Sequence, residues 1–574
     1  MAAARNVLFI MYDQLRWDYL SCSGHPHLQT PNFDRVAEQG VRFTRCYVQS
    51  PVCGSSRMST YTGRYVSSHG AFYNGVPLKV GELTMGDHLR EAGMDCVLVG
   101  KTHMRADTQG MQRLGIAPDG IIGARVSECG FDMGVRDDGL NSNAPDGSYA
   151  ELDSAYNRYL TMRGYDSANP WHDHANAGVD DKLNIKSGFE MINAALPANI
   201  AEQDSETTWL TSEMINWLER RYETSDPASA DNAPWCVHLS YIKPHWPYIV
   251  PAPYHNMYSP DHVMPAVQGE HERENAHPVL QAFQRGQVAT TSSEQTVRES
   301  YIPAYMGLIK QCDDQLGRLL DYLQDTGRLD DTVVVLTSDH GDYLGDHYLG
   351  EKGLWHDCSV KVPLIVMDPD TRADATRGTS CDALVEAIDV LPTVVDVHAG
   401  SSAVASKNHI LEGHSLLPYI RATDRASQLP PANREYAVSE YDFSLTPVRE
   451  SLGLTVDQCR WYVIIDQRWK YVAFSGDFRP VLFDLENDPD ELQDLGDSEL
   501  SEHRRVISKM ESRLRDWFGR NPQRTTLSDE QILDKAGKSV RQGVVLGVYQ
   551  ASDEQEPLFA HYRGKVKKDY TNGS

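Results

Sequence analysis

The chain has 574 residues, a formal net charge of −27, and 40% hydrophobic and 24% charged residues. This length exceeds what one simple hydrophobic core serves, so we expect a large domain and a smaller one. The composition is that of a globular protein, and the negative charge argues against a broad nucleic-acid-binding surface. An anionic substrate would need a local cluster of cations.

The amino-terminal segment and the cysteines favour a cytoplasmic protein. The segment MAAARNVLFIMYDQ has a short apolar run interrupted by Asp13, which makes a poor signal peptide and is too short to span a bilayer. The ten cysteines form no CxxC pair, and Cys96 and Cys236 lie within apolar runs. We therefore expect buried, reduced thiols and no membrane contact.

Apolar, β-branched runs alternate with helix-like segments, which predicts an α/β fold with buried parallel strands. In the amphipathic segment 30–40, Thr30 is the expected N-cap and Pro31 stands in the first helical turn. The expected strands occupy residues 6–14, 96–103, 235–245, 332–342 and 362–370.

Later parts of the chain differ in composition and in hydrophobic pattern. Residues 110–230 are rich in Gly, Asn, Asp and Ser, which predicts a long irregular insertion or lid with little regular structure. The stretch 459–495 indicates antiparallel strands, and 501–520 has the pattern of an amphipathic helix. The expected parts are a catalytic domain (1–430), a C-terminal α+β subdomain (431–525) and a polar arm (526–574) that could contact another subunit.

Four of the five expected strands end in residues that can bind a metal ion or transfer a proton. In open α/β sheets, ligands bind at the carboxyl ends of strands, so one site built from distant segments is expected. The strand-end residues are Asp13 with Gln14, Lys101 with His103, Lys243 with His245, and Asp339 with His340.

Two of these pairs predict a metal site. Asp13, Gln14, Asp339 and His340 offer two carboxylates, an amide oxygen and an imidazole, although such residues can also merely cap strands. Oxygen ligands suit Ca²⁺ or Mg²⁺, whereas one nitrogen ligand moves the preference toward a transition metal. Mn²⁺ is the expected ion, with Ca²⁺ or Zn²⁺ as alternatives.

The stretch CGSSR at residues 53–57 predicts an anion site. If a helix begins at Cys53, its backbone N–H groups and dipole favour negative charge there, and Arg57 lies on the same helical face. A thiolate at that point would be acidic and nucleophilic. Taken alone, Cys53 is also compatible with a small buried hydrophobic residue.

These motifs together resemble the type I sulfatases of the alkaline phosphatase superfamily. The sequence has C-x-S-x-R, then STYTG, with GKTH and SDHGD downstream. The resemblance covers most of residues 5–400, and residues 73–78, 241–258 and 338–353 are similar to the phosphonate monoester hydrolase and broad-specificity arylsulfatase branch. It implies an alkaline-phosphatase-like sandwich, with a large mostly parallel sheet flanked by helices and a smaller C-terminal subdomain with an antiparallel sheet.

The family pattern also differs from this sequence at two places. Ser55 stands where the family motif has Pro or Ala. Asp339-His340 stands where sulfatases of the calcium type usually carry Asp-Asn.

The resemblance implies that a maturation enzyme converts Cys53 to Cα-formylglycine, which is also a metal ligand. The hydrated aldehyde is a geminal diol. One of its oxygens, stabilised by Arg57, attacks sulfur or phosphorus in line and expels the alcohol. The second hydroxyl then loses its proton, the C–O bond breaks, and sulfate or phosphonate leaves.

The same resemblance assigns the remaining roles, with an ordinary packing or surface role as the alternative for most of them. Lys101 polarises the diol or binds substrate oxygens, and His103 takes the proton that triggers release. His245 and Lys352 hold the anionic group and protonate the leaving oxygen. The residues expected to contact substrate are Asn74 and Thr102.

We therefore expect a metal-dependent hydrolase of sulfate monoesters and phosphonate monoesters or phosphate diesters, acting on a small anionic ester. The alternatives are a choline-sulfatase-like alkyl sulfatase, a phosphodiesterase with unmodified Cys53, and a degenerate relative that only binds anions. The family branch and the C-terminal arm suggest a homo-oligomer, with a tetramer expected, and no nucleic-acid or membrane partner.

Overall fold

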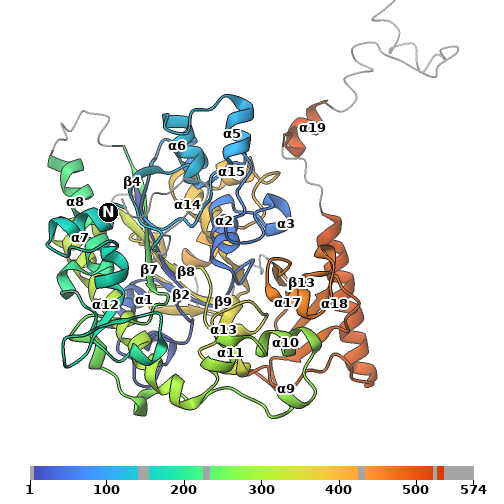
Figure 1. Ribbon diagram of the computed structural model, residues 1–574. Helices are drawn as coiled ribbons and strands as arrows, with labels where there is room; N and C mark the ends of the chain where they lie inside the picture. Colours follow the sequence, from blue (N-terminus) through green and yellow to red (C-terminus); the bar gives the residue numbers. More distant parts are fainter. Residues whose placement is uncertain (1–4, 140–153, 224–232, 424–433, 521–525, 536–574) are drawn as a thin grey trace, which may run out of the picture. The chain divides into compact units, whose positions relative to one another are not determined.

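The computed structural model describes residues 5–139, 154–223, 233–423, 434–520 and 526–535 (Figure 1). The chain divides into two compact units, one of residues 1–404 with 411–521 and the other of 405–410 with 522–574. The border expected near residue 430 falls within the first unit and stays a prediction. Of the expected arm, residues 536–574 lie outside the described residues, and α19 (Asp529–Lys535) is its one described helix.

The first unit is built on a nine-stranded, mostly parallel sheet, as the sequence predicted. Its order is β10-β2-β9-β8-β1-β7-β3-β4, with β11 paired to β2. The central strand β1 pairs in parallel with β7 and β8, and all three are buried along their whole length, as strands covered on both faces are. The strands are β1 (Asn6–Asp13), β2 (Val41–Tyr47), β3 (Asp95–Gly100), β4 (Asp132–Arg136), β7 (Trp235–Pro244), β8 (Thr332–Ser338), β9 (Lys361–Met367), β10 (Thr379–Cys381) and β11 (Val385–Glu386).

Helices cover both faces of this sheet, because alternate residues of β1 point to opposite sides. Leu8, Ile10 and Tyr12 pack in one apolar cluster with residues of α8 and α12. Val7, Phe9 and Met11 pack in another with residues of α2, α4 and α14. Figure 1 shows α8 and α12 on one side of the sheet and α2 and α14 on the other, which confirms the expected sandwich.

The helices differ widely in length, from single turns to the 31 residues of α12. As expected, α1 follows Thr30 and starts with Pro31, but the Thr30 hydroxyl bonds Ser21 instead of capping the helix. The helices of the first unit are α1 (Pro31–Gln39), α2 (Cys53–Thr62), α3 (Val66–His69), α4 (Met85–Glu91), α5 (Thr108–Leu114), α6 (Ile121–Ser127), α7 (Ala155–Met162), α8 (Glu206–Glu223), α9 (His271–Glu274), α10 (Pro278–Gln284), α11 (Gln287–Ser292), α12 (Gln295–Asp325), α13 (Asp357–Val360), α14 (Val390–Ala399), α16 (Leu417–Ile420), α17 (Pro447–Ser451) and α18 (Ser501–Gly519), and α15 is Ser401–Ala405.

One strand runs in the opposite direction to the prediction. Residues 362–370 were expected to form a parallel strand, but β9 is antiparallel to both β8 and β2. A continuous apolar run shows that a strand is buried on both faces and does not fix its direction. The segment 339–360 holds only the single turns η10 (Asp346–Tyr348) and α13, so it lacks the long helix that usually carries a parallel crossover.

The expectation of little regular structure in residues 110–230 is wrong for the described part of that range. It contains α6, α7, α8, the edge strand β4 and a small hairpin of β5 (Ala177–Val179) and β6 (Ile185–Ser187). The helix α8 escaped prediction because its buried face includes Thr207, Thr208 and Thr211 beside Trp209, which weakens the apolar periodicity. Residues 140–153 and 224–230 of the range lie outside the described residues.

The C-terminal part confirms the predicted antiparallel sheet and amphipathic helix. The strands β12 (Ala437–Asp442), β13 (Arg460–Ile465), β14 (Trp469–Phe474) and β15 (Val481–Asp484) pair in that order. Four apolar residues of α18, spaced three or four apart, pack on this sheet: Val506, Met510, Leu514 and Trp517. In the described part of the chain, no helix combines the length and apolarity needed to cross a bilayer.

Glu440 on β12 is a buried carboxyl at the edge of this sheet. Its side chain accepts a hydrogen bond from the Ser67 backbone N–H at 2.8 Å, and the residue is 5% exposed. Burial raises the pKa of Glu440 to about 7 from 4.5. The folded protein therefore keeps a proton that the unfolded chain loses as the pH rises from 4.5 to 7. Because of this group, the free energy of unfolding falls as the pH rises through that window.

We expect Glu440→Gln, which keeps the acceptor oxygen for Ser67, to remove this penalty. The variant should gain free energy of unfolding relative to the unchanged protein, and this gain should be about 3 kcal/mol larger at pH 8 than at pH 4.5. Urea denaturation followed by tryptophan fluorescence at both pH values measures the difference. The control is Glu435→Gln, since that side chain is 80% exposed, and it should show no such pH dependence. Equal pH profiles for the Glu440 variant and the unchanged protein would contradict the prediction.

Candidate active site

The helix α2 begins at Cys53, as the sequence predicted, and all ten of its residues are buried. The residue before it, Val52, is extended, so the chain turns into the helix at the cysteine itself. The Gly54 backbone N–H donates to Asn74 Oδ1 at 2.8 Å. The Ser55 hydroxyl donates to Ser50 Oγ at 2.7 Å, so serine at this position is fully accommodated.

Four buried side chains converge beside the start of α2. Cys53, Asp13, Asp339 and His340 each offer a ligand atom, and these atoms all lie within 4.8 Å of one another. Cys53 Sγ lies 3.0 Å from His340 Nε2, which in turn lies 3.7 Å from Oδ1 of both aspartates. His340 Nδ1 lies 2.8 Å from the Gly341 carbonyl and donates to it, so Nε2 faces the group with its lone pair.

Two buried cations hold the outer oxygens of these carboxylates. Arg57 donates from Nε to Asp339 Oδ2 at 2.7 Å and from Nη2 to Asp13 Oδ2 at 3.2 Å. Lys101 Nζ is 2.6 Å from the same oxygen of Asp13. Burial alone would raise the pKa of Asp13, but the charges of Lys101 and Arg57 hold it well below its usual value. Asp13 thus stays ionised, and both aspartates turn Oδ1 toward His340.

Gln14, the fourth predicted metal ligand, takes a different position. Its backbone N–H donates to Asp339 Oδ1 at 3.1 Å, which places the residue beside the group. Its side chain, however, donates to Asp342 Oδ2 at 2.5 Å, and its Oε1 accepts from Lys352 at 2.9 Å. The amide oxygen is therefore bonded to a lysine here, and the role of Gln14 as a metal ligand stays a prediction.

A cavity of about 400 Å³ opens above Cys53. Predicted residues from five separate segments line it: Cys53, Asn74, Lys101, His103, His245 and Lys352. The cavity also has lining residues that the sequence did not predict, chiefly Tyr73, Asp138, Trp171, Trp246, Glu351 and Tyr441. The predicted local cluster of cations is therefore present on a chain whose net charge is strongly negative.

Thr102 does not line this cavity. Its hydroxyl donates to Glu128 Oε2 at 3.1 Å, and its backbone N–H donates to Asp138 Oδ1 at 3.0 Å. The structure therefore does not bring Thr102 to the position that its predicted substrate contact needs. The reason is the turn at His103, which has a φ of 55° and directs neighbouring residues to different sides.

Asp138 holds the His103 turn in place. Its Oδ1 accepts from the backbone N–H groups of both Thr102 and His103, and Arg136 Nε donates to its Oδ2 at 2.9 Å. Burial and the charge of Lys101 lower the pKa of His103, so its imidazole is neutral. Asp138 follows a short polar edge strand in a stretch expected to be irregular, which left no sequence signal for this role.

His245 and Lys352 form a pair on the other wall of the cavity. Lys352 Nζ lies 3.3 Å from His245 Nε2, and His245 Nδ1 donates to the Trp246 carbonyl at 2.6 Å. Burial and the charge of Lys352 hold the pKa of His245 well below its usual value. Burial opposes the charge of Lys352, but Cys53, Glu351 and Asp13 raise its pKa overall, so the lysine carries the proton of the pair.

A second group of buried side chains, Glu272, His347 and His356, also has its ligand atoms within 4.8 Å of one another. Its geometry is less suitable. The rings of His347 and His356 are stacked, with centroids 3.8 Å apart and planes 12° apart, and His347 Nδ1 already bonds Glu272 at 2.7 Å. Stacked rings direct their nitrogen lone pairs in separate parallel planes, so one ion would require a ring to rotate.

Comparison with known proteins identifies the family of the chain. The sequence profile described as Sulfatase matches residues 5–401, and that described as N-sulphoglucosamine sulphohydrolase, C-terminal, matches residues 345–518. The chain is 31% identical over 518 residues to the multifunctional alkaline phosphatase superfamily protein PehA of Trinickia caryophylli, covering 86% of this chain and 91% of that protein. It is 27% identical over 505 residues to an arylsulfatase of Clostridium perfringens, covering 86% and 90%.

A solved structure gives the same result at the level of the fold. The phosphonate monoester hydrolase of Agrobacterium radiobacter superposes with a TM-score of 0.74 at 27% identity, covering 92% of this chain and 99% of that one. The chain therefore belongs to the sulfatase family, a group of sulfate- and phosphonate-ester hydrolases within the alkaline phosphatase superfamily.

Proposed function

We propose that this enzyme hydrolyses sulfate monoesters and phosphonate monoesters or phosphate diesters, with a divalent metal ion and a formylglycine derived from Cys53. The observation that carries the proposal is the convergence of four ligand atoms on the first turn of α2, at the floor of a cavity lined by cations. The names of the relatives, an arylsulfatase and a phosphonate monoester hydrolase, support both classes of ester.

The residues present fit a divalent metal ion. Asp13 and Asp339 each keep Oδ1 turned toward His340 Nε2, while their other oxygens are bonded to Arg57. Such a mixed oxygen and nitrogen set favours Mn²⁺ over Ca²⁺. Asp13, Asp339, His340 and residue 53 would hold the ion, which when bound supplies Lewis acidity and makes a neighbouring hydroxyl more acidic.

The protein's own groups can perform the remaining steps. Formylglycine at position 53, once hydrated, supplies two hydroxyls on one carbon, one for attack and one for release. Lys101 and Lys352 place positive charge on two walls of the cavity, where they bind the oxygens of the anionic ester. Lys352 carries a proton that the leaving oxygen can take, with His245 Nε2 as its partner. The neutral His103 can accept the proton whose loss releases the product.

Burial sets the order of events in maturation. Cys53 is 1% exposed, and every residue from Cys53 to Thr62 is buried. An enzyme that modifies this side chain has no access to it in the folded protein. The proposed conversion to formylglycine must therefore precede the closure of the chain around α2.

The first test joins activity to the chemical state of residue 53. We expect turnover of aryl sulfates and phenyl phosphonates with Mn²⁺ supplied, and a peptide mass at position 53 that has lost sulfur and two hydrogens and gained one oxygen. Cys53→Ser should abolish turnover, whereas Cys22→Ser, a change at a remote and half-buried cysteine, should not. Full activity in protein that carries an ordinary thiol at residue 53 would favour the unmodified-cysteine phosphodiesterase instead.

The second test locates the metal ion. We expect about one Mn²⁺ per chain in metal analysis, and a loss of affinity of at least about tenfold in His340→Gln. The matched control is His356→Gln in the second group of buried side chains, which should retain the metal. Circular dichroism checks that both variants fold. If only the His356 variant loses the ion, the metal binds at the second group and the proposed metal site is wrong.

A further inference from the structure

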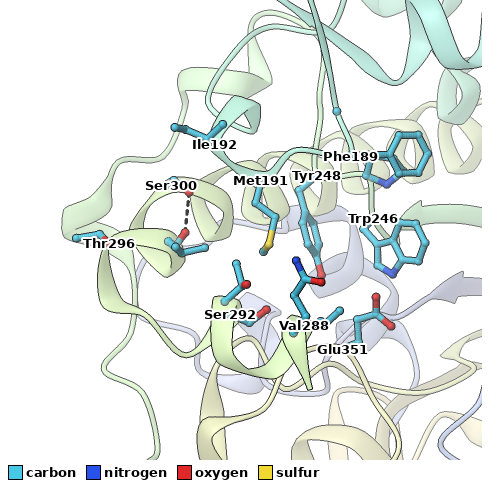
Figure 2. Close-up of a pocket in the computed structure, with 15 residues that line it drawn as sticks. Phe189, Met191, Ile192, Trp246, Tyr248, Val288, Ser292, Thr296, Ser300 and Glu351 are labelled. Carbon is cyan, nitrogen blue, oxygen red and sulfur yellow. Dashed lines mark hydrogen bonds between the residues drawn. The ribbon is translucent and has the colours of Figure 1, made fainter. Parts of the chain in front are cut away.

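A second cavity, of about 630 Å³, adjoins the active-site cavity (Figure 2). Trp246 and Glu351 belong to the linings of both cavities, so they form the junction between them. In Figure 2 these two side chains stand at one end of the second cavity, and Ile192 and Thr296 stand at the other. The rest of its lining is mainly apolar and includes Phe189, Met191, Pro247, Tyr248, Val288 and Val297.

The walls of this cavity expose large apolar side chains. Ile192 is 80% exposed, Val288 is 47% exposed and Phe189 is 41% exposed. Single exposed apolar residues are common, but several that line one concave surface mark a site that binds an apolar group. The described residues leave these three side chains open to solvent, so their position implies an occupant.

The junction lies beside His245 and Lys352, where the proposed mechanism has the alcohol depart. Trp246 follows His245 directly, with the two ring centroids 4.7 Å apart, and Glu351 precedes Lys352. His245 and Lys352 are the pair that the proposed mechanism uses to protonate the leaving oxygen. An ester placed with its anionic group over Cys53 and its leaving oxygen at this pair directs the rest of its alcohol toward the second cavity.

Glu351 adds a constraint of charge. Its backbone has a φ of 56°, so a non-glycine residue is held in the left-handed region at the junction. Among the described residues, none forms an ion pair or hydrogen bond with its carboxylate. A negative charge at this point repels any alcohol that carries an anionic group of its own.

We propose that the second cavity binds the alcohol portion of the ester and that this alcohol carries a long, apolar, uncharged group. The proposal rests on the proposed hydrolase function, and it adds the substrate class that the active-site cavity alone does not define. A third cavity of about 540 Å³ also borders Glu351 and Lys352, but it lacks Trp246, the neighbour of His245. It is the competing location for the alcohol.

A series of 4-alkylphenyl sulfates and phosphonates tests the proposal, since lengthening the alkyl chain hardly changes the acidity of the phenol. In the unchanged protein we expect kcat/KM to rise about threefold for each of the first few added methylenes, because each is removed from water. The readout is the ratio of kcat/KM for the octyl ester to that for the methyl ester. Met191→Glu should lower this ratio about tenfold or more. Ile192→Glu should also lower it, and the side chain of Ile192 is too exposed for this change to threaten folding.

Two matched variants act as controls for position. Ile121→Glu alters an apolar residue on α6 that is 74% exposed and lies outside the three cavities, and it should leave the ratio unchanged. Leu452→Glu alters the third cavity alone and should also leave the ratio unchanged. A fall in the ratio for Leu452→Glu but not for Met191→Glu would overturn the proposal and place the alcohol in the third cavity.

A separate experiment tests the effect of charge on the alcohol. We expect a 4-(2-carboxyethyl)phenyl ester to be hydrolysed at least about tenfold less efficiently than the corresponding carboxamide, because Glu351 lies at the junction. Glu351→Gln should shrink that difference. No difference between the two esters, or a difference that persists in Glu351→Gln, would remove the assigned role of this carboxylate.

The remaining outcomes separate this inference from the proposed function. If no sulfate or phosphonate ester is hydrolysed, the proposed function fails and the inference fails with it. If short and long esters are hydrolysed equally, the function stands and the apolar alcohol site is wrong. If Ile192→Glu changes the oligomeric state measured by light scattering, the cavity is an interface between copies of the chain, which also overturns the proposal.

Discussion

The arrangement of the active site depends on one buried guanidinium. Arg57, fully buried on α2, bonds the carboxylates of Asp13 at the end of β1 and Asp339 after β8. It also donates from Nη1 to the Lys101 carbonyl after β3 and to Ser240 Oγ on β7. One planar group thus ties the ends of four parallel strands to the helix that begins at Cys53.

The contacts of Arg57 decide which oxygen of each carboxylate remains for chemistry. Two buried carboxylates without a cation would take up protons, since burial disfavours their charge. With Arg57 and Lys101 on their outer oxygens, Asp13 stays ionised and both aspartates turn Oδ1 toward His340. A lysine at position 57 could not replace the arginine, because only the planar fork reaches both carboxylates and two further acceptors at once.

The sequence predicted the strands and their polar ends well, because a strand buried on both faces is a continuous apolar run and its carboxyl end is where the polar residues resume. Asp13, Asp339 and His340 could be grouped with Gln14 on that basis, whereas Cys53 joined them only through the family resemblance. The direction of β9 could not, since it depends on the connection rather than the strand. The positions of Gln14 and Thr102 depend on the competing acceptors Asp342 and Glu128, which nothing in their local sequence reveals.

Asp138 shows a different limit. It accepts from the backbone N–H groups of the turn at His103 and from Arg136 on β4, and such a role needs only a carboxylate at the right place. Neither spacing nor periodicity distinguishes it from Asp137 beside it. Residues that position others through the backbone therefore escape prediction more readily than residues that bind a ligand directly.

The net charge of −27 and an anionic substrate are compatible because they act over different distances. Fields from exposed charges are screened beyond about 8 Å at physiological ionic strength, so most of the surface charge has little effect inside the cavity. Lys101 and Lys352 line that cavity, and in the proposed mechanism they bind the ester at short range. Among the described residues, Glu351 is the carboxylate that lines both cavities, and the further proposal has it act on the alcohol at the same range. The two proposals thus rest on one short-range electrostatic effect, which would attract the anionic end of the ester and select an uncharged group at the other.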